Sequence, residues 1–522
     1  MADRPHGGLV PIWIALGLGL VVGRIARVES PHGDTVMLSA NDRSRWCTIR
    51  ALGDEGTFFI DSIIRERDPR TGRRIWHTID RVRHRGWDGK EHDYSSKPPL
   101  LPVLLTGEYV ALRTLTGASF ATHPHYVMRV MLAITNGGML ALMWYVMGIR
   151  LIRWQVAVWT FHVLMAMATL GTFLTTFSVT LNNHLPAAFG CLLAAEGVLR
   201  IREGDGRLPW FVLAGAGSAW AAVNELPALS LVAAVGGCLL LVSPRRMLLG
   251  FIPPVLLLAA AFFGTTWWAH GSWRPPYAHR DDGAVLAAWD AAAARPPAEP
   301  GPVDADWRRR LKVSGIELGR AARWEWTADE GRWAVFDPAS GRRWAVRFSD
   351  GGRVELRAWD DWYDYAGSYW RKPRGIDRGE PRRDVYAFHV LIGHHGVLSL
   401  TPFWWLSLAG LVWSWRREDR AMRWLAAITT AITLVCVIFF IFRPLADRNY
   451  GGMTTGFRWL FWLIPCWWLA ARPAVERLER HGAGRALVAI LLAVSIFSAA
   501  YGAMQPWSQP WLFTYWRQLG WL

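Results

Sequence analysis

Residues 245–268 read RRMLLGFIPPVLLLAAAFFGTTWW, so two arginines stand directly before a long apolar run that ends in two tryptophans. This run contains no Asp, Glu, Lys or Arg and reaches the roughly 20 residues that an α-helix needs to cross a bilayer. Comparable runs occupy residues 156–177 and 424–442. A helix in lipid satisfies its own backbone hydrogen bonds, which irregular chain cannot do. The sequence therefore predicts a polytopic α-helical membrane protein.

Short loops that contain Arg recur between the apolar runs, at residues 150–153, 200–207, 245–246, 416–420 and 472–485. Short basic loops stay on the cytoplasmic side of a membrane. Consecutive loops are separated by enough apolar sequence for two crossings, so each midpoint is predicted to lie outside. The midpoints are Asn182-Asn183-His184, Asn224-Glu225, a long loop ending at His394-His395, and Arg448-Asn449-Tyr450. Polar groups gathered on one face predict an active site there.

The spacing of the apolar runs predicts about 11 transmembrane helices. The spans are expected at residues 8–23, 126–148, 155–176, 185–200, 208–223, 226–242, 247–268, 397–415, 421–442, 457–471 and 485–503. They divide the chain into an N-terminal membrane module, residues 1–268, and a C-terminal membrane module, residues 397–522. Arg4 before the first span predicts a retained signal anchor with a cytoplasmic N-terminus. The expected location is the plasma (inner) membrane, with the active face external.

Two external segments accompany the membrane modules. The first is a long loop, residues 24–125. Residues 98–115 within it are apolar but contain Glu108 and Arg113, and a crossing there would invert every later loop. We interpret them as an amphipathic helix lying at the membrane surface. The second segment, residues 269–396, holds three strand-like stretches at 332–337, 343–348 and 353–359, separated by turn sequences, and predicts a small external α+β unit.

Composition excludes several classes of protein. The net charge is +16, but Arg is spread over many loops and no nucleic-acid motif accompanies it. Membrane lipids are the expected partners of this charge, and nucleic acid is not. The five cysteines show no CxxC spacing, so the sequence indicates neither a disulfide framework nor a zinc site. We expect no cofactor and no metal centre.

The first external loop contains the candidate motifs Asn41-Asp42-Arg43-Ser44-Arg45-Trp46 and Lys97-Pro98-Pro99. Lys97 is one of only four lysines among 58 basic residues, so the chain uses Arg almost everywhere else. A lysine at a membrane surface can serve as a compact phosphate ligand, or it can extend from the interface to water. Asp42 is able to accept a hydroxyl proton, although most loop acids are simply solvated.

These motifs resemble the GT-C superfamily of polyprenyl-phosphate-sugar-dependent glycosyltransferases, in particular the protein O-mannosyltransferase and lipid A aminoarabinose transferase families. In those families an acidic pair in the first external loop precedes an Arg-aromatic pair. By this resemblance Asp42 is the catalytic carboxylate, Arg43 replaces the second acid, and Arg45-Trp46 is the Arg-aromatic pair. The resemblance also implies that Lys97 contacts the phosphate of the donor, and that the membrane domain has a GT-C-like fold.

Candidate residues also occur at the other external tips. Asn183 and His184 stand where the families have a further acid, and Glu225 is the nearest carboxylate that is able to replace it. Glu225 would be costly in lipid and is expected to face a cavity. His394 and His395 are expected to bind sugar or phosphate rather than metal, because adjacent side chains diverge and no third ligand is near. At the last tip, Arg448, Asn449 and Tyr450 precede Gly451-Gly452, which is consistent with an anion site or with a tight turn.

The sequence therefore favours a glycosyltransferase that moves a hexose or pentose from a polyprenyl-phosphate carrier to a lipid, glycan or protein acceptor outside the cytoplasm. The alternative is a secondary transporter or lipid translocator, although the sequence shows neither repeats nor charges at mid-membrane. A membrane-anchored sugar-binding module built on residues 269–396 would leave Asp42, Lys97 and Glu225 without a role.

Overall fold

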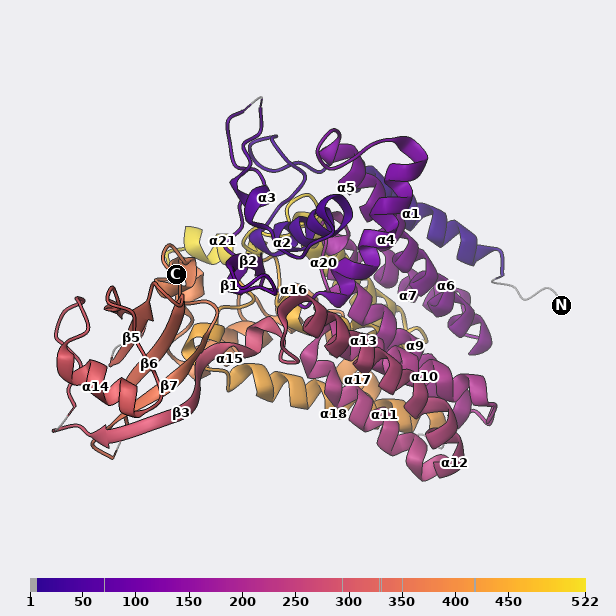
Figure 1. Ribbon diagram of the computed structural model, residues 1–522. Coiled ribbons are helices and arrows are strands. Elements are labelled where there is room, and N and C mark those ends of the chain that lie inside the picture. The colour runs from indigo at the N-terminus through magenta and orange to yellow at the C-terminus, as the bar shows by residue number, and fades with distance from the viewer. Residues whose placement is uncertain are drawn as a thin grey trace.

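The computed structural model describes residues 7–69, 71–292, 294–327, 329, 331–349, 351–416 and 419–522. Arg4 and residues 417–418 of one basic loop lie outside the described residues. The protein is mostly helical, with the membrane helices on one side of Figure 1 and a β-rich unit on the other. We call this unit the external unit because it lies outside the body of membrane helices.

Seven helices within the described ranges are long and apolar enough to cross a membrane. They are α1 (Leu9–Arg27), α5 with α6 (Pro124–Arg153), α7 with α8 (Val158–Val179), α9 (His184–Arg202), α12 with α13 (Pro244–His270), α18 (Arg420–Ile441) and α20 (Gly482–Tyr501). The other four predicted spans are also helical but shorter. They are α10 (Leu208–Asn224), α11 (Leu229–Val242), α17 (Trp404–Trp415) and α19 (Ile464–Leu478).

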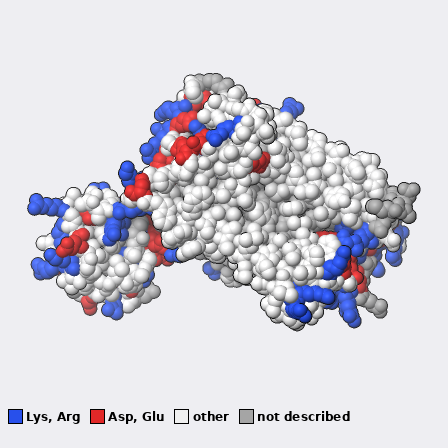
Figure 2. All heavy atoms as spheres, turned by 45° about the vertical axis from the view of Figure 1, so that its right-hand side comes forward, with Lys and Arg blue, Asp and Glu red and all other residues white. Residues whose placement is uncertain are grey.

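The surface of the molecule agrees with a place in a membrane. Figure 2 shows Lys, Arg, Asp and Glu gathered at the two ends of the helical body and over the external unit, with a broad uncharged belt between them. Leu256 and Leu257 of α13 are 63% and 70% exposed. Transfer of such a side chain from water to an apolar environment is favourable by about 1.5–3 kcal/mol, and lipid provides that environment. The protein is therefore membrane-embedded.

Local sequence explains where these helices begin and end. Asp419 caps α18 by accepting hydrogen bonds from the amides of Ala421 and Met422, which are two of the donors that a helix start leaves unpaired. Pro244 opens the helical stretch Pro244–His270, where a missing amide proton costs nothing. That helix ends at Gly271, whose φ of +65° is the left-handed conformation that closes many helices.

The first external loop folds into α2 (Ala40–Arg50), α3 (Asp61–Arg65), the hairpin β1 (Arg81–Arg85) with β2 (Glu91–Ser95), and α4 (Leu100–Thr116). Helix α4 matches the expected surface helix and is not among the seven membrane-spanning candidates. It packs against α2. The hairpin was not predicted from the sequence, because its strands are short and strongly charged.

The external unit is a five-stranded antiparallel sheet in the order β3-β7-β6-β5-β4. The strands are β3 (Arg280–Asp290), β4 (Arg323–Trp326), β5 (Arg332–Asp337), β6 (Arg342–Ser349) and β7 (Arg353–Asp361). Helix α14 (Ala305–Val313) covers a core that includes Trp307, Trp324 and Val335. The three strand-like stretches are confirmed as β5, β6 and β7. Both edge strands, β3 and β4, were missed.

After the sheet the chain returns to the membrane through α15 (Arg383–Leu391) and α16 (Val397–Leu400). Between α18 and α19 lie two short 3-10 turns, Leu445–Asp447 and Arg458–Leu463. The last helix, α21 (Trp511–Gln518), follows a segment in which Trp507 packs against the tips of the membrane helices.

Candidate functional site

A cavity of about 790 Å³ lies where the first external loop, the helix tips and the external unit meet. Asn183, His184, Glu225 and Asn449, from three of the predicted external tips, all line it. A slightly larger cavity of about 880 Å³ lies between the end of α1 and α5, with mainly apolar walls. The smaller cavity contains the buried charges, so it is the candidate active site.

Two arginines dominate one side of this cavity. Arg45 on α2 is only 4% exposed. It donates from Nη1 to the carbonyl of Asn41 at 3.1 Å, and from Nη2 to Oδ1 of Asn183 at 2.6 Å. Arg458 donates from Nε to the carbonyl of Gly451 and from Nη1 to Nε2 of His184, both at 2.8 Å. No carboxylate of the described residues forms an ion pair with either guanidinium.

The electrostatics of this arginine pair favour an anion. Burial, together with the positive charge of Arg458, lowers the pKa of Arg45 to about 10. Burial also lowers the pKa of Arg458. With a pKa of about 10, Arg45 is cationic at neutral pH. The carboxylates of Asp80 and Glu225 oppose both shifts, but neither forms an ion pair with a guanidinium, so a phosphate group could still pair directly with both cations.

Glu225 lies at the end of α10 and is 7% exposed. Its Oε1 accepts a hydrogen bond from Nδ2 of Asn183 at 2.7 Å and another from Nδ1 of His184. Arg458 is only a donor, so the His184 ring must accept at Nε2 and have its proton on Nδ1. Oε2 of Glu225 makes no hydrogen bond to any described residue. This arrangement fixes the carboxylate and leaves one oxygen able to accept a proton from a substrate.

Lys97 also lines the cavity, beside an acid that the sequence analysis did not single out. Its Nζ lies 3.0 Å from Oδ2 of Asp80. Burial lowers the pKa of Lys97, and the Asp80 carboxylate opposes that shift. The amide of Lys97 donates to Oγ of Ser95 at 3.1 Å, which fixes the backbone before Pro98. Lys97 therefore faces the cavity as an ion pair and does not extend to bulk water.

Asp42, the expected catalytic carboxylate, is fully buried and does not line the cavity. It stands in the first turn of α2 in a capping box with Ser39. Oδ1 accepts from the amide of Ser39 at 3.0 Å and from its hydroxyl at 3.2 Å. Oδ2 accepts from the amide of Leu38 at 3.0 Å and from the Thr180 hydroxyl at 2.7 Å. Burial raises the pKa of Asp42 although these bonds oppose the shift.

This geometry gives Asp42 a positioning role. Its four accepted hydrogen bonds leave no free lone pair for a substrate proton. The Thr180 hydroxyl that Asp42 holds accepts in turn from Nε1 of Trp507 at 3.2 Å, and Trp507 lines the cavity. The guanidinium of Arg458 lies 4.9 Å from the centre of the Trp507 ring. Asp42 thus acts on the cavity through Thr180 and Trp507.

Five further candidate residues do not line the cavity. They are Arg43, His394, His395, Arg448 and Tyr450. Arg43 turns to the other side of α2 and donates to the carbonyl of His77 at 2.8 Å. Arg448 donates to the carbonyl of Pro381 at 3.0 Å, outside the cavity.

The two histidines belong to a separate aromatic cluster. The His395 ring stacks on Tyr450 with ring centres 5.0 Å apart, and Nδ1 of His394 lies 2.5 Å from Nδ1 of His395. Burial lowers the pKa of His394 to about 3, so its ring is neutral at physiological pH. Within the described ranges, no group of three or more His, Cys, Asp and Glu side chains is arranged to hold a metal ion.

Sequence reasoning missed several residues of the cavity. They are Asp80, Tyr277, Arg280, Tyr363, Trp370, Asp377, Arg443, Asp447 and Arg458. A signal existed for Arg458, because it is a single cation inside the apolar stretch 457–464 at a predicted external tip. The residues from 277 to 377 had no comparable signal, since only the fold brings the external unit to the membrane helices.

Comparison with known proteins adds no assignment. No protein-family model matches this sequence, and no curated protein is detectably similar to it. Function must therefore be argued from the cavity itself.

Proposed function

We propose that this protein is a membrane glycosyltransferase that uses a polyprenyl-phosphate sugar as donor. The observation that supports this best is the pair Arg45 and Arg458, two cations without a carboxylate partner in a cavity at the ends of membrane helices. A polyprenyl phosphate needs a binding site of this kind, because its apolar chain can remain in the membrane while its phosphate group binds cations outside the lipid.

The walls of the cavity fit the different parts of this donor. Leu226, Phe439, Phe440 and Trp459 form an apolar wall beside α11 and α18, along which a polyprenyl chain would lie. Arg45, Arg458 and Lys97 supply the cations for the phosphate. Glu225 offers the free carboxylate oxygen for the acceptor hydroxyl. The acceptor is a lipid, a glycan or a protein.

The proposed reaction is a displacement at the anomeric carbon of the sugar. The acceptor oxygen forms a bond to this carbon while the bond from the carbon to the phosphate oxygen breaks. The hydroxyl proton passes to Oε2 of Glu225, and the electron pair of the broken bond leaves with the phosphate. Negative charge grows on the phosphate in the transition state, where Arg45 and Arg458 stabilise it without reorganising.

A release assay tests this function without knowledge of the acceptor. Purified protein in lipid nanodiscs would be incubated with undecaprenyl phosphate bearing radiolabelled glucose, galactose, mannose or arabinose and with a membrane extract. The assay measures the loss of the label from the carrier. We expect turnover of one donor, and a decrease of about 10²- to 10⁴-fold in Glu225→Gln, because a general base is lost.

The matched control is Glu380→Gln. Glu380 accepts from the Tyr450 hydroxyl outside the cavity, so this variant should keep wild-type turnover. Failure of all four donors to react with the wild-type protein would overturn the proposal. Passage of an intact donor across a proteoliposome membrane, with its sugar-phosphate bond unbroken, would instead identify a lipid translocator.

A further inference from the structure

The external unit contributes one complete wall of the cavity. Tyr277 and Arg280 precede and open β3, while Tyr363 and Trp370 follow β7. Strands β3 and β7 are paired so that Arg280 lies opposite Asp361. Because these strands are antiparallel, the segment before β3 and the segment after β7 lie at the same end of the sheet, beside the cavity. Trp370 reaches the first external loop, where its Nε1 donates to the carbonyl of Ile79 at 3.0 Å.

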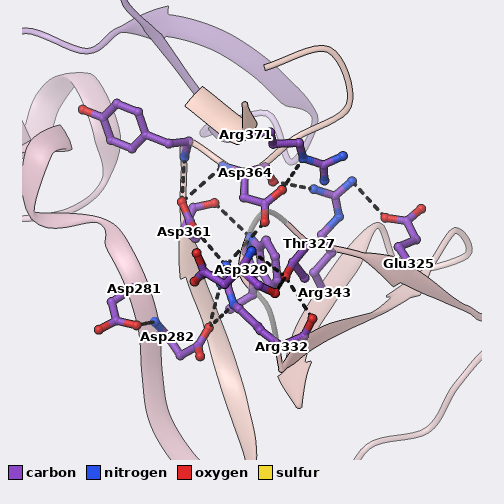
Figure 3. A network of polar contacts seen from close by, with 12 residues as sticks. Asp281, Asp282, Glu325, Thr327, Asp329, Arg332, Arg343, Asp361, Asp364 and Arg371 are labelled. Carbon is purple, nitrogen blue, oxygen red and sulfur yellow. Dashed lines mark hydrogen bonds and ion pairs between the residues drawn. The ribbon is translucent and has the colours of Figure 1, made fainter. Parts of the chain in front are cut away.

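A buried ion network fixes the segment that follows β7 (Figure 3). The Arg332 side chain has no solvent exposure, and its Nη1 lies 2.9 Å from Oδ2 of Asp361 and 3.4 Å from Oδ2 of Asp364. Asp364 also pairs with Arg371, and its carbonyl accepts from Arg343 at 3.1 Å. Both ends of the stretch that contains Tyr363 and Trp370 are thus held to the sheet. Buried pairs of this kind give conformational order more reliably than net stability.

The groups on this wall differ from those on the rest of the cavity. The Arg280 guanidinium lies 4.2 Å from the centre of the Tyr363 ring and 5.6 Å from that of Trp370. The Tyr277 hydroxyl makes no hydrogen bond to any described residue. Asp377 accepts from the Tyr369 hydroxyl at 2.8 Å and from Nδ2 of Asn449 at 3.3 Å, and both Asp377 and Asn449 line the cavity. Flat aromatic surfaces thus alternate with fixed polar groups.

We propose that this outer wall binds the saccharide, so that the external unit selects the sugar. Tyr363 and Trp370 would contact the apolar faces of the ring. The Tyr277 hydroxyl, together with Asp377 and Asn449, would form hydrogen bonds to its hydroxyls. Sugars present both kinds of surface, and small-molecule sites combine apolar walls with a few fixed polar groups. The inference rests on the proposed function, because the apolar wall and the arginine pair already account for the chain and the phosphate. The sugar is the part of the donor that remains.

Calorimetric titration of the full-length protein in nanodiscs tests this assignment. The probes are undecaprenyl phosphate alone and the same carrier bearing glucose, galactose, mannose or arabinose. We expect the wild-type protein to bind one sugar-bearing carrier at least about 10-fold more tightly than the bare carrier, as a few hydrogen bonds suffice for that difference. Tyr277→Phe should reduce this preference by about 3- to 10-fold, the effect of one hydrogen bond. Trp370→Ala should abolish it.

Both variants should bind the bare carrier as tightly as the wild-type protein, which shows that they are folded. Trp326→Ala is the control, because Trp326 on β4 is 51% exposed and does not line the cavity. If the wild-type protein bound all five probes equally, or if Tyr277→Phe and Trp370→Ala kept the preference, the sugar assignment would be wrong while the proposed function stood. If the wild-type protein bound none of the five, the proposed function would fail and this inference with it.

Discussion

Replacing Arg458 with glutamine should weaken the binding of a polyprenyl phosphate by about 10- to 150-fold. Two of the three nitrogens of this guanidinium are used within the protein, by Gly451 and His184, and Nη2 makes no hydrogen bond to any described residue. A hydrogen bond to a charged group contributes about 1.5–3 kcal/mol, and every 1.4 kcal/mol changes a dissociation constant tenfold. Loss of the Nη2 contact gives the stated range.

The assay is calorimetric titration of undecaprenyl phosphate into protein in nanodiscs, at low and at high salt. Arg448→Gln is the matched control, because Arg448 lies near the same tip but donates to the carbonyl of Pro381 outside the cavity. Arg45→Gln should weaken binding to a similar extent. The double variant should lose less than the sum of the two, since both cations act on one phosphate. An Arg458→Gln affinity within threefold of wild type, or an equal loss in Arg448→Gln, would refute the assignment of the arginine pair.

Three further predictions concern the fold around the site. Asp42→Asn should lower the free energy of unfolding by about 1–3 kcal/mol, because an amide cannot accept hydrogen bonds at both of its ends. A lower melting temperature with near-normal carrier affinity would confirm this. An unchanged melting temperature with lost turnover would instead indicate a direct catalytic role for Asp42. Burial raises the pKa of Glu108 to about 7. The contribution of Glu108 to stability is therefore fully present below its unfolded pKa of about 4.5 and is lost as pH rises through 7. Glu108→Gln should raise the melting temperature more at pH 8 than at pH 5, and a gain that does not depend on pH would contradict this. All five native cysteines are buried, so they should not react with an impermeant thiol reagent. A cysteine introduced at Val313, which is 86% exposed, should react with this reagent from outside intact cells, whereas one at Arg245 should react only after permeabilisation. The reverse pattern would invert the topology.

The membrane helices could be predicted because charge and hydropathy act locally. Every predicted span overlaps a helix, since an apolar run between basic loops has few other ways to pair its backbone. The lengths of the helices were less predictable. For example, α10 ends just before Glu225 and α11 begins after the short turn Leu226–Ala228, so the two do not form one long helix. Among the described residues, seven helices, and not all of the predicted spans, are therefore long and apolar enough to cross a bilayer by themselves.

The candidate site could be predicted only in part. Alternation of the loops was sufficient to bring Asn183, His184 and Glu225 to one place. It could not distinguish Arg448 from Arg458, because the backbone between them turns in a way that side-chain chemistry does not reveal. Tyr450, Gly451 and Gly452 have φ values of +58°, +89° and +81°. These left-handed residues reverse the chain, so Arg448 points to Pro381 and Arg458 points into the cavity.

The difference between Asp42 and Asp80 has a similar origin. Both acids lie in the first external loop, and the family resemblance favours the one nearer to the Arg-aromatic pair. Asp42, however, follows Ser39 by three residues at a helix start, and that spacing commits its carboxylate to backbone amides. Asp80 stands just before β1, outside any helix, and its carboxylate is left to pair with Lys97.

The pairing of the cavity charges indicates which groups respond to substrate. Asp447 is shared between Arg443 at 2.7 Å and Arg280 at 3.6 Å, and Asp80 neutralises Lys97, so these charges are compensated before any ligand arrives. Arg45 and Arg458 form hydrogen bonds only to neutral acceptors, and the carboxylates of Asp80 and Glu225 act on them only from a distance. An incoming phosphate therefore gains most from these two arginines. His184 also joins this pair to Glu225, because its Nε2 accepts from Arg458 and its Nδ1 donates to Oε1 of Glu225. Donor binding and activation of the acceptor hydroxyl would then be coupled through the single ring of His184.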